Sequence, residues 1–241
     1  MPTAVLIDGA YFIKRFRYIE PHNSYDAKRA SEQAFRWAVA HLVEGRTNGQ
    51  QRKHELYRIF FYDCPPIANK LHNPITKKLV DFSKSKEALF RLELHELLRQ
   101  KRKVALRLGH LAGDAQWTLK GPVVQELLKG KKKLDDVSES DVIPSVRQKG
   151  VDMRIGIDIA SLSIKKQVDQ IVLIAGDADF VPAAKLARRE GVDFVLDPMW
   201  QSIPAGLNEH IDGLRSTCPM PQRRVAQAAP AAGVAQQANP V

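Results

Sequence analysis

Short apolar runs alternate with longer amphipathic stretches along most of this chain. The apolar runs have the length and residue types of strands, which we predict at residues 4–7, 55–66, 103–110, 170–175 and 192–197. Between them, apolar residues recur at helical spacing, which predicts helices over 26–44, 82–101, 151–166, 178–190 and 204–215. This alternation is typical of an α/β fold, in which helices cover both faces of a mostly parallel sheet.

The same spacing predicts which side of two helices packs on the sheet. In the helix over 82–101, the predicted apolar stripe consists of Ala88, Leu89, Leu92, Leu97 and Leu98. In the helix over 151–166, the residues at helical spacing are Met153, Ile157 and Ile164. We expect both stripes to be buried.

The periodicity fails in two segments. Residues 112–150 are charged and punctuated by glycine, which favours a loop or a small excursion from the main fold. Residues 216–241 are rich in Ala, Gln and Pro, a composition that predicts a disordered tail. We therefore expect one domain over residues 1–215, followed by the tail.

Composition indicates a soluble protein with an anionic partner. No apolar run approaches the roughly 20 residues of a membrane-spanning helix, so we expect no membrane contact. The formal net charge of +10 and the pI near 9.6 favour nucleic acid as the partner, with general solubility charge as the alternative. Cys64 and Cys218 lack the spacing of a zinc site or a disulfide scaffold. With no visible secretion signal, a cytoplasmic location is expected.

Acidic side chains follow several of the predicted strands. Asp8 follows the first strand and Asp63 the second, while Asp177 and Asp179 follow the fourth in the stretch LIAGDADFVP. Asp152 lies at the entry to the helix that precedes the fourth strand. Because carboxyl ends of parallel strands share one edge of a sheet, these carboxylates could converge, and a cation would then relieve their repulsion. Oxygen ligands suit Mg²⁺ or Mn²⁺.

Each of these residues also has a simpler explanation. Aspartate directly after a strand often caps the next helix by accepting hydrogen bonds from its first N–H groups, and this alternative stays open for each residue taken singly. Asp158 lies six residues beyond Asp152, about 240° round a helix, so it is a secondary candidate, as is Asp63.

Basic side chains surround these motifs. Lys149, Arg154 and Lys185 are candidates for contacting phosphates, and a solvated helix face is the alternative for each of them. No HExxH pair and no glycine-rich phosphate loop is present in the sequence. With a basic surface nearby, a phosphodiester is the natural substrate for a carboxylate-held metal, which would activate water.

The chain contains, in this order, VLIDGAYF, FFYDCPP, KGVDMRIGIDIASLSI, GDADFVPAAKLARREGVDFVLDPM and HIDGL. Together these motifs resemble the NYN family of LabA-like proteins, a branch of the PIN-like nucleases, over roughly residues 3–215. The resemblance implies a Rossmann-like three-layer α/β/α sandwich whose acidic cleft binds Mg²⁺ or Mn²⁺ and cleaves RNA. It also implies that the metal and catalytic residues are Asp8, Asp152, Asp177 and Asp179, with Asp158 and Asp63 nearby. One departure is Tyr11, because many relatives have Asn there.

The leading hypothesis is therefore a metal-dependent ribonuclease in which the aspartates hold the metal and water attacks the phosphate. The second is a weak or inactive RNA-binding regulatory module on the same fold. DNA as the substrate and homo-oligomerisation are left open. A phosphatase of the haloacid dehalogenase type is disfavoured, because the first strand is followed by DGA and not by Asp-x-Asp.

Overall fold

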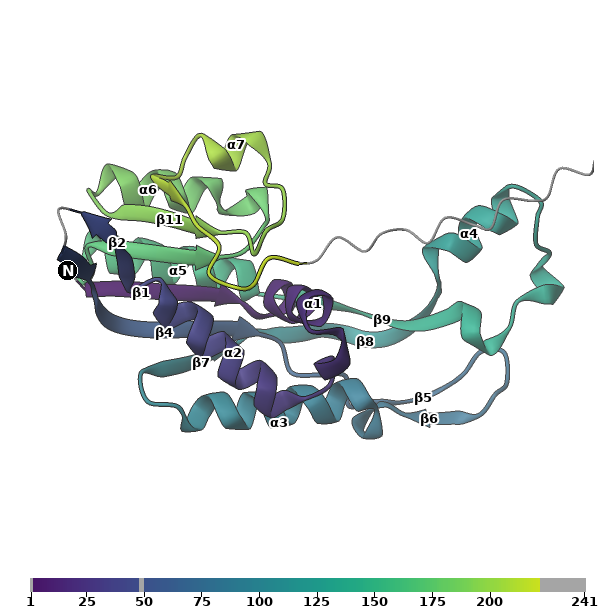
Figure 1. The fold of residues 1–241 in the computed structure, drawn as a ribbon. Coiled ribbons are helices and arrows are strands. Elements are labelled where there is room, and N and C mark those ends of the chain that lie inside the picture. Colours follow the sequence, from purple (N-terminus) through teal and green to yellow (C-terminus); the bar gives the residue numbers. More distant parts are fainter. Residues whose placement is uncertain (1, 48–49, 222–241) are drawn as a thin grey trace, which may run out of the picture.

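The computed structural model describes residues 2–47 and 50–221, and its centre is a six-stranded parallel sheet (Figure 1). In spatial order the strands are β12 (Gly213–Leu214), β11 (Asp193–Asp197), β10 (Gln170–Ile174), β1 (Pro2–Asp8), β4 (Glu55–Asp63) and β7 (Val104–Leu108). Every neighbouring pair is parallel. The predicted α/β class is confirmed.

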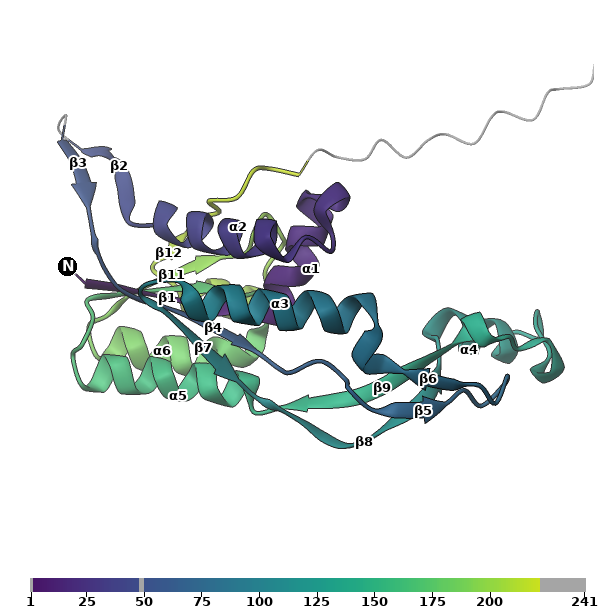
Figure 2. The same cartoon turned by 90° about the horizontal axis from the view of Figure 1, so that it is seen from below.

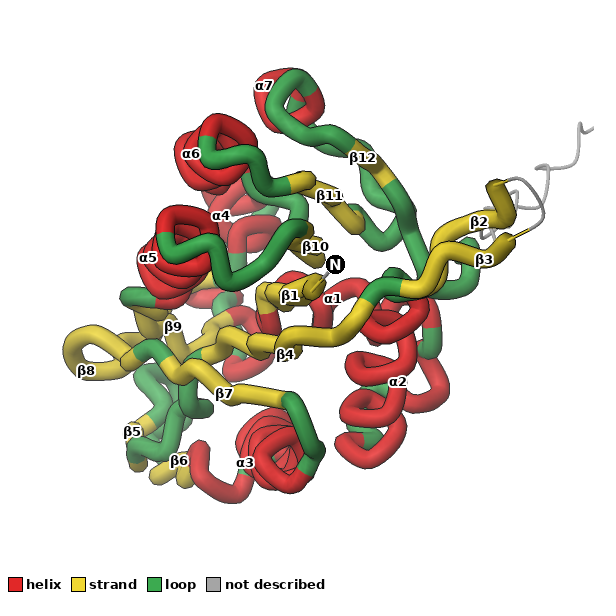
Figure 3. The backbone as a smooth tube through the Cα atoms, turned by 90° about the vertical axis from the view of Figure 1, so that its left-hand side faces the viewer, coloured by secondary structure: helices red, strands yellow, loops and turns green. Residues whose placement is uncertain are grey.

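Helices cover both faces of the sheet, as the end-on view in Figure 3 shows. One face carries α1 (Gly9–Ile19), α2 (Ala27–Ala40) and α3 (Lys86–Gln100), and the other carries α5 (Val151–Ile164) and α6 (Val181–Arg189). Because side chains alternate along a strand, β1 sends Val5 and Ile7 into the first core, and Ala4 and Leu6 into the second. These three layers are the predicted sandwich.

The strand order creates a switch point between β1 and β10. From β1 the chain moves outward through β4 to β7, then returns to β10 on the other side and continues through β11 to β12. The helices that follow β1 and β10 therefore lie on opposite faces, and a crevice opens between the carboxyl ends of these two strands. Ile7 pairs with Ile174 in this register, so Asp8 and the residues after Ile174 lie side by side.

Two hairpins project beyond the carboxyl edge of the sheet (Figures 1 and 2), and together we call them the arm. One hairpin pairs β5 (Lys70–His72) with β6 (Leu79–Asp81). The other pairs β8 (His110–Leu119) with β9 (Val142–Lys149) and carries α4 (Gly121–Leu128) at its tip. The expected loop or small excursion over 112–150 is therefore an ordered antiparallel hairpin. Many of its side chains, such as Gln116 and Ser145, are exposed, which is why its sequence looked like a loop.

The remaining elements are short. A fourth pair of strands joins β2 (Val43–Thr47) to β3 (Gln50–Lys53), and α7 (Ala205–Asn208) replaces most of the predicted last helix. Single 3-10 turns occur at Pro21–Asn23, Phe82–Lys84, Leu134–Asp136, Glu139–Asp141 and Ala178–Phe180. Within the described residues, no helix is both long and apolar enough to cross a membrane.

Several local predictions were wrong. The helix α1 directly after Asp8 was not among the predicted helices, and α2 ends at Ala40 instead of residue 44. Leu89 and Leu92 of α3 are about half exposed, as are the three residues predicted to form the stripe of α5. The sequence of α5 is apolar on most sides, so the spacing alone could not show that Ile155 and Ile159 form its buried face.

The tail also begins later than expected. The Thr217 hydroxyl donates to the Trp37 carbonyl, and Cys218 is buried in the core beside the first group of helices. Residues 216–218 therefore continue the packed structure, because these side chains find apolar and polar partners there. The expectation of disorder for 222–241 lies outside the described residues.

Candidate functional site at the switch point

Asp8 ends β1 and caps α1. Its Oδ1 accepts a hydrogen bond of 3.1 Å from the Tyr11 N–H, which satisfies one of the free donors at the start of the helix. Burial raises the pKa of the carboxyl to about 6; the charges of Asp152 and Asp63 add to the rise, and the N–H groups of Tyr11 and Ala10 oppose it. The next residue must be Gly9, because a Cβ there would lie 2.5 Å from the Tyr62 carbonyl oxygen.

Asp177 occupies the equivalent position three residues beyond β10. Its Oδ1 accepts a hydrogen bond of 3.1 Å from the Asp179 N–H and so caps the 3-10 turn that leads into α6. Both Asp177 and Asp179 are exposed at the mouth of the crevice. The capping alternative is therefore realised for Asp8 and for Asp177. Because a capping hydrogen bond uses only one carboxylate oxygen and fixes its direction, each of these two carboxylates can cap a helix and also bind a metal ion.

Asp152 completes the acidic group. It is the second residue of α5. The residue before this helix is Gly150, whose φ of +81° is the left-handed conformation that glycine adopts easily. Partial burial raises the pKa of the Asp152 carboxyl, and the negative charges of Asp177 and Asp179 raise it further. Because Asp152 also raises the pKa of Asp8, its carboxylate interacts through space with each of the other three predicted residues.

This arrangement suits a divalent cation only in part. Among the described residues, no three His, Cys, Asp or Glu side chains lie close enough together to hold a metal ion jointly. Mg²⁺ usually keeps several waters and is bound through only one or two carboxylates plus phosphate oxygens of the substrate. The oxygen donors and their mutual repulsion therefore fit such an ion with few protein ligands.

The two secondary candidates have other partners. Asp63 is buried at the end of β4, where Arg91 and His95 of α3 donate to its two oxygens, His95 at 2.8 Å. Asp158 accepts a hydrogen bond of 2.8 Å from the Tyr62 hydroxyl and forms an ion pair of 3.3 Å with Arg107. The structure thus does not bring these two carboxylates to the mouth of the crevice.

A cavity of about 740 Å³ opens at the switch point. Its lining comes from β1 and α1, from the start of the 3-10 turn after β10, and from the loop after β11: Asp8, Ala10, Tyr11, Lys14, Gly176, Asp177, Ala178, Gln201, Ser202, Ile203 and Pro204. We did not predict Lys14, Gln201 or Ser202. Lys14 follows Tyr11 by three residues, so it lies on the same face of α1. Gln201 and Ser202 lie in the loop after β11, the strand next to β10. Both signals are visible in the sequence.

Tyr11 ties the two sides of this cavity together. Its hydroxyl donates a hydrogen bond of 2.6 Å to the Pro198 carbonyl, and burial raises its pKa to about 12, so it stays neutral. Its ring lies against Gly176, where a Cβ would come within 2.5 Å of a ring carbon. At the position where the resemblance leads us to expect Asn, this chain therefore has a packing residue that anchors the loop after β11.

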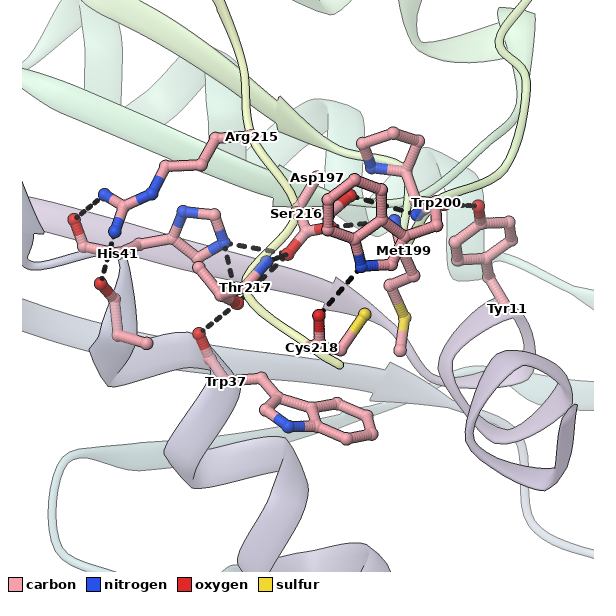
Figure 4. A network of polar contacts seen from close by, with 12 residues as sticks. Tyr11, Trp37, His41, Asp197, Met199, Trp200, Arg215, Ser216, Thr217 and Cys218 are labelled. Carbon is pink, nitrogen blue, oxygen red and sulfur yellow. Dashed lines mark hydrogen bonds and ion pairs between the residues drawn. The ribbon is translucent and has the colours of Figure 1, made fainter. Parts of the chain in front are cut away.

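A polar network fixes the same loop from the other side (Figure 4). Asp197, at the end of β11, accepts hydrogen bonds from His41 at 2.9 Å and from the Met199 N–H at 2.7 Å, and it also contacts Thr217. Met199 and Trp200 have φ values of +46° and +64°, a conformation that costs a non-glycine residue roughly 1–2 kcal/mol. The network holds the loop in this costly shape.

The predicted phosphate-binding residues lie outside this cavity. Lys149 ends β9, Arg154 follows Asp152 by two residues on α5, and Lys185 lies on α6; all three side chains are exposed. Lys149 and Arg154 flank Gly150 and so lie close in sequence to Asp152. They remain candidates for contacts on either side of the acidic group.

Residues 120–204 match the family model of the NYN domain. The match covers about a third of the chain and includes Asp152, Asp177 and Asp179, whereas Asp8 lies before it. It does not distinguish the LabA-like proteins from other members of the family. No curated protein and no solved structure gives a significant match. The all-parallel sheet and its two helical layers are consistent with the PIN-like fold of NYN domains.

Proposed function

We propose that this protein is a ribonuclease that depends on Mg²⁺ or Mn²⁺. The observation that carries the proposal is the group formed by Asp8, Asp152, Asp177 and Asp179, in which the charge of Asp152 raises the pKa of Asp8 and the charges of Asp177 and Asp179 raise the pKa of Asp152. Carboxylates whose pKa values are raised by burial and by neighbouring negative charges are found more often at functional sites than elsewhere. The NYN match over the segment that holds three of them supports the same reading.

In this proposal each residue has a distinct task. The metal, when bound, would lower the pKa of the attacking water and stabilise the leaving oxygen. Asp8 and Asp177 are the proposed ligands within the cavity, because both line it and both are held by capping hydrogen bonds. Asp152 and Asp179 would complete the acidic group, one of them serving as a base, and Lys14 would hold a phosphate of the substrate.

The flanking basic residues would set the path of the RNA. Lys149, Arg154 and Lys185 are exposed, and we propose that they contact phosphates beyond the scissile bond. Such contacts are sequence-independent and weaken with salt, so they would position the strand without selecting its bases.

A second function deserves a test because of two observations. No three acidic, His or Cys side chains within the described part of the chain are assembled for a metal, and Tyr11 occupies a position where relatives often have an amide. Both would suit a regulatory module that binds RNA but turns it over slowly or not at all. Binding without cleavage would be its signature.

The decisive experiment is cleavage of a labelled single-stranded RNA pool, with matched DNA, in Mn²⁺, Mg²⁺ or EDTA. Wild type should cut RNA only with a metal, and Asp177→Asn should lower the rate at least about 100-fold, as expected for loss of one electrostatic group. Asp169→Asn is a matched control, because Asp169 is also exposed but lies before β10, at the other end of that strand. Equal activity of the two variants would contradict the proposed site, and RNA binding without cleavage would favour the regulatory module.

A further inference from the structure

Two more cavities continue from the switch point along α1. The first, of about 600 Å³, shares Gln201 and Ser202 with the switch-point cavity and is also lined by Arg15, Tyr18 and Trp200. The second, of about 410 Å³, shares Tyr18 with the first and extends to His22. The three cavities adjoin one another through these shared lining residues, and we call them together the α1 groove, which extends from Asp8 to the C-terminal end of α1.

The wall of the α1 groove follows from the sequence of α1. Tyr11, Lys14, Arg15 and Tyr18 are three or four residues apart and therefore share one face of the helix. The face begins beside the acidic group, continues with two cationic residues and ends with an aromatic ring. The order of these side chains places positive charge and then a flat apolar surface next to the proposed site of cleavage.

The two aromatic rings of the α1 groove are both accessible and held in place. Tyr18 is 51% exposed and Trp200 is 45% exposed. The Arg15 guanidinium lies 4.9 Å from the centre of the Tyr18 ring while also donating to the Met199 carbonyl. The indole N–H of Trp200 donates a hydrogen bond of 2.8 Å to the Cys218 carbonyl, so its polar group is satisfied within the protein (Figure 4). Fixed, half-exposed rings can bind a flat partner at little cost in entropy.

From this geometry we propose that the α1 groove binds the unpaired bases of a single RNA strand, which stack on Tyr18 and Trp200 a few nucleotides from the scissile phosphate. This proposal rests on the proposed function in that its ligand is an RNA. A base is the fitting occupant, because stacking on aromatic rings tolerates any sequence and the exposed cation Lys14 suits a polyphosphate, while the buried Arg15 holds the Tyr18 ring. In a duplex the bases are already stacked inside the helix, so duplex RNA cannot use these rings.

The length of α1 sets the length of strand that can reach Tyr18. The nine steps from Gly9 to Tyr18 span about 14 Å at the rise of an α-helix. This distance corresponds to roughly four stacked nucleotides. Tyr18 should therefore contribute to binding of strands longer than about four nucleotides and should have no effect on a dinucleotide.

The test is binding of a labelled oligouridylate of about 12 nucleotides in EDTA, measured by fluorescence anisotropy, so that no cleavage is needed. Tyr18→Ala should weaken binding about tenfold, and Tyr18→Phe should bind like wild type because it retains the ring. Tyr25→Ala is the matched control: Tyr25 is 53% exposed and lies beneath Arg17 but does not line the α1 groove. Thermal unfolding of each variant checks the fold.

Three outcomes would overturn the proposal. Equal losses from Tyr18→Ala and Tyr25→Ala would mean that no specific ring is used. Equal losses from Tyr18→Phe and Tyr18→Ala would point to the hydroxyl instead of stacking. Unchanged binding by Tyr18→Ala would leave the groove to another occupant, such as residues 222–241. If wild type cuts no RNA but its RNA binding depends on Tyr18, the nuclease proposal fails and the proposal for the α1 groove stands. If wild type cuts RNA but Tyr18→Ala does not weaken RNA binding, the nuclease proposal stands and the proposal for the α1 groove fails.

Discussion

Four neighbouring strands of the sheet place an aspartate at the same edge, but the outer two differ from the central two in their partners. Asp63 after β4 is bound by Arg91 and His95, and Asp197 after β11 is bound by His41. Among the described residues, no Lys, Arg or His forms a salt bridge with Asp8 or Asp177. A position at a strand end is therefore shared by paired and unpaired aspartates, and the proposed ligands are the two without a cationic partner among the described residues.

The difference follows from the topology. Toward the edges of the sheet, α3 supplies Arg91 and His95, and the residue after α2 supplies His41. At the switch point the helices after β1 and β10 leave on opposite faces, so only the N–H groups at their first turns meet the carboxylates. Outer aspartates hold the fold together, while central aspartates stay available to a ligand.

The largest effect should come from breaking an outer pair. Asp63→Ala would leave Arg91 and His95 without their buried partner, and such a loss typically costs about 3–5 kcal/mol of unfolding free energy. Denaturant unfolding measures it. Asp177→Ala, at an exposed central position, should lose only its cap of the 3-10 turn, at a cost of about 0.5–1 kcal/mol. Similar values for the two variants would abolish the distinction.

At a buried central position the sign should reverse. Asp8→Asn should raise the unfolding free energy by about 1–2 kcal/mol at pH 7 without metal, because it removes a buried charge that its neighbours repel. The folded pKa of about 6 lies above the ordinary value of 3.8, so stability is lost as pH rises through this range. The advantage of Asn over Asp should therefore grow between pH 4 and pH 7, in thermal melts at each pH. A destabilised Asp8→Asn would show that Asp8 serves the fold alone.

A paired carboxylate in the arm should show the opposite pH response, with a small and local effect. Asp141 accepts hydrogen bonds from the Lys132 ammonium and from the Ser138 N–H and hydroxyl, which lower its pKa to about 2. Its contribution is present above the ordinary value of 3.8 and is lost as pH falls toward 2. Amide hydrogen exchange at Ser138 and Asp141 should become relatively faster in acid. Protection that rises in acid, after correction for intrinsic rates, would contradict the pairing.

The sequence was informative where periodicity and chain order coincide. The strands before Asp8 and Asp177 are continuous apolar runs, so their carboxyl ends, and with them the central acidic residues, could be located without a structure. The resemblance to the NYN family drew in part on the same strand ends, in VLIDGAYF and GDADF, and in part on the start of α5 in KGVD.

The partners of each aspartate could not be predicted in this way. Arg91 and His95 lie 28 and 32 residues from Asp63, and His41 lies 156 residues from Asp197. Pairing over such separations depends on where helices cross the sheet, which spacing within one element does not reveal. For the same reason no pattern within one element predicts that Tyr18 and Trp200 both line the α1 groove.

The arm gives the molecule an outline that differs from that of a sphere of equal mass. A chain of 27.0 kDa that extends well beyond its central sheet experiences more friction in water than a compact one. A single copy should therefore elute early from a sizing column and sediment slowly for its mass. Light scattering or sedimentation equilibrium, which report mass independently of outline, are the appropriate ways to count subunits in this protein.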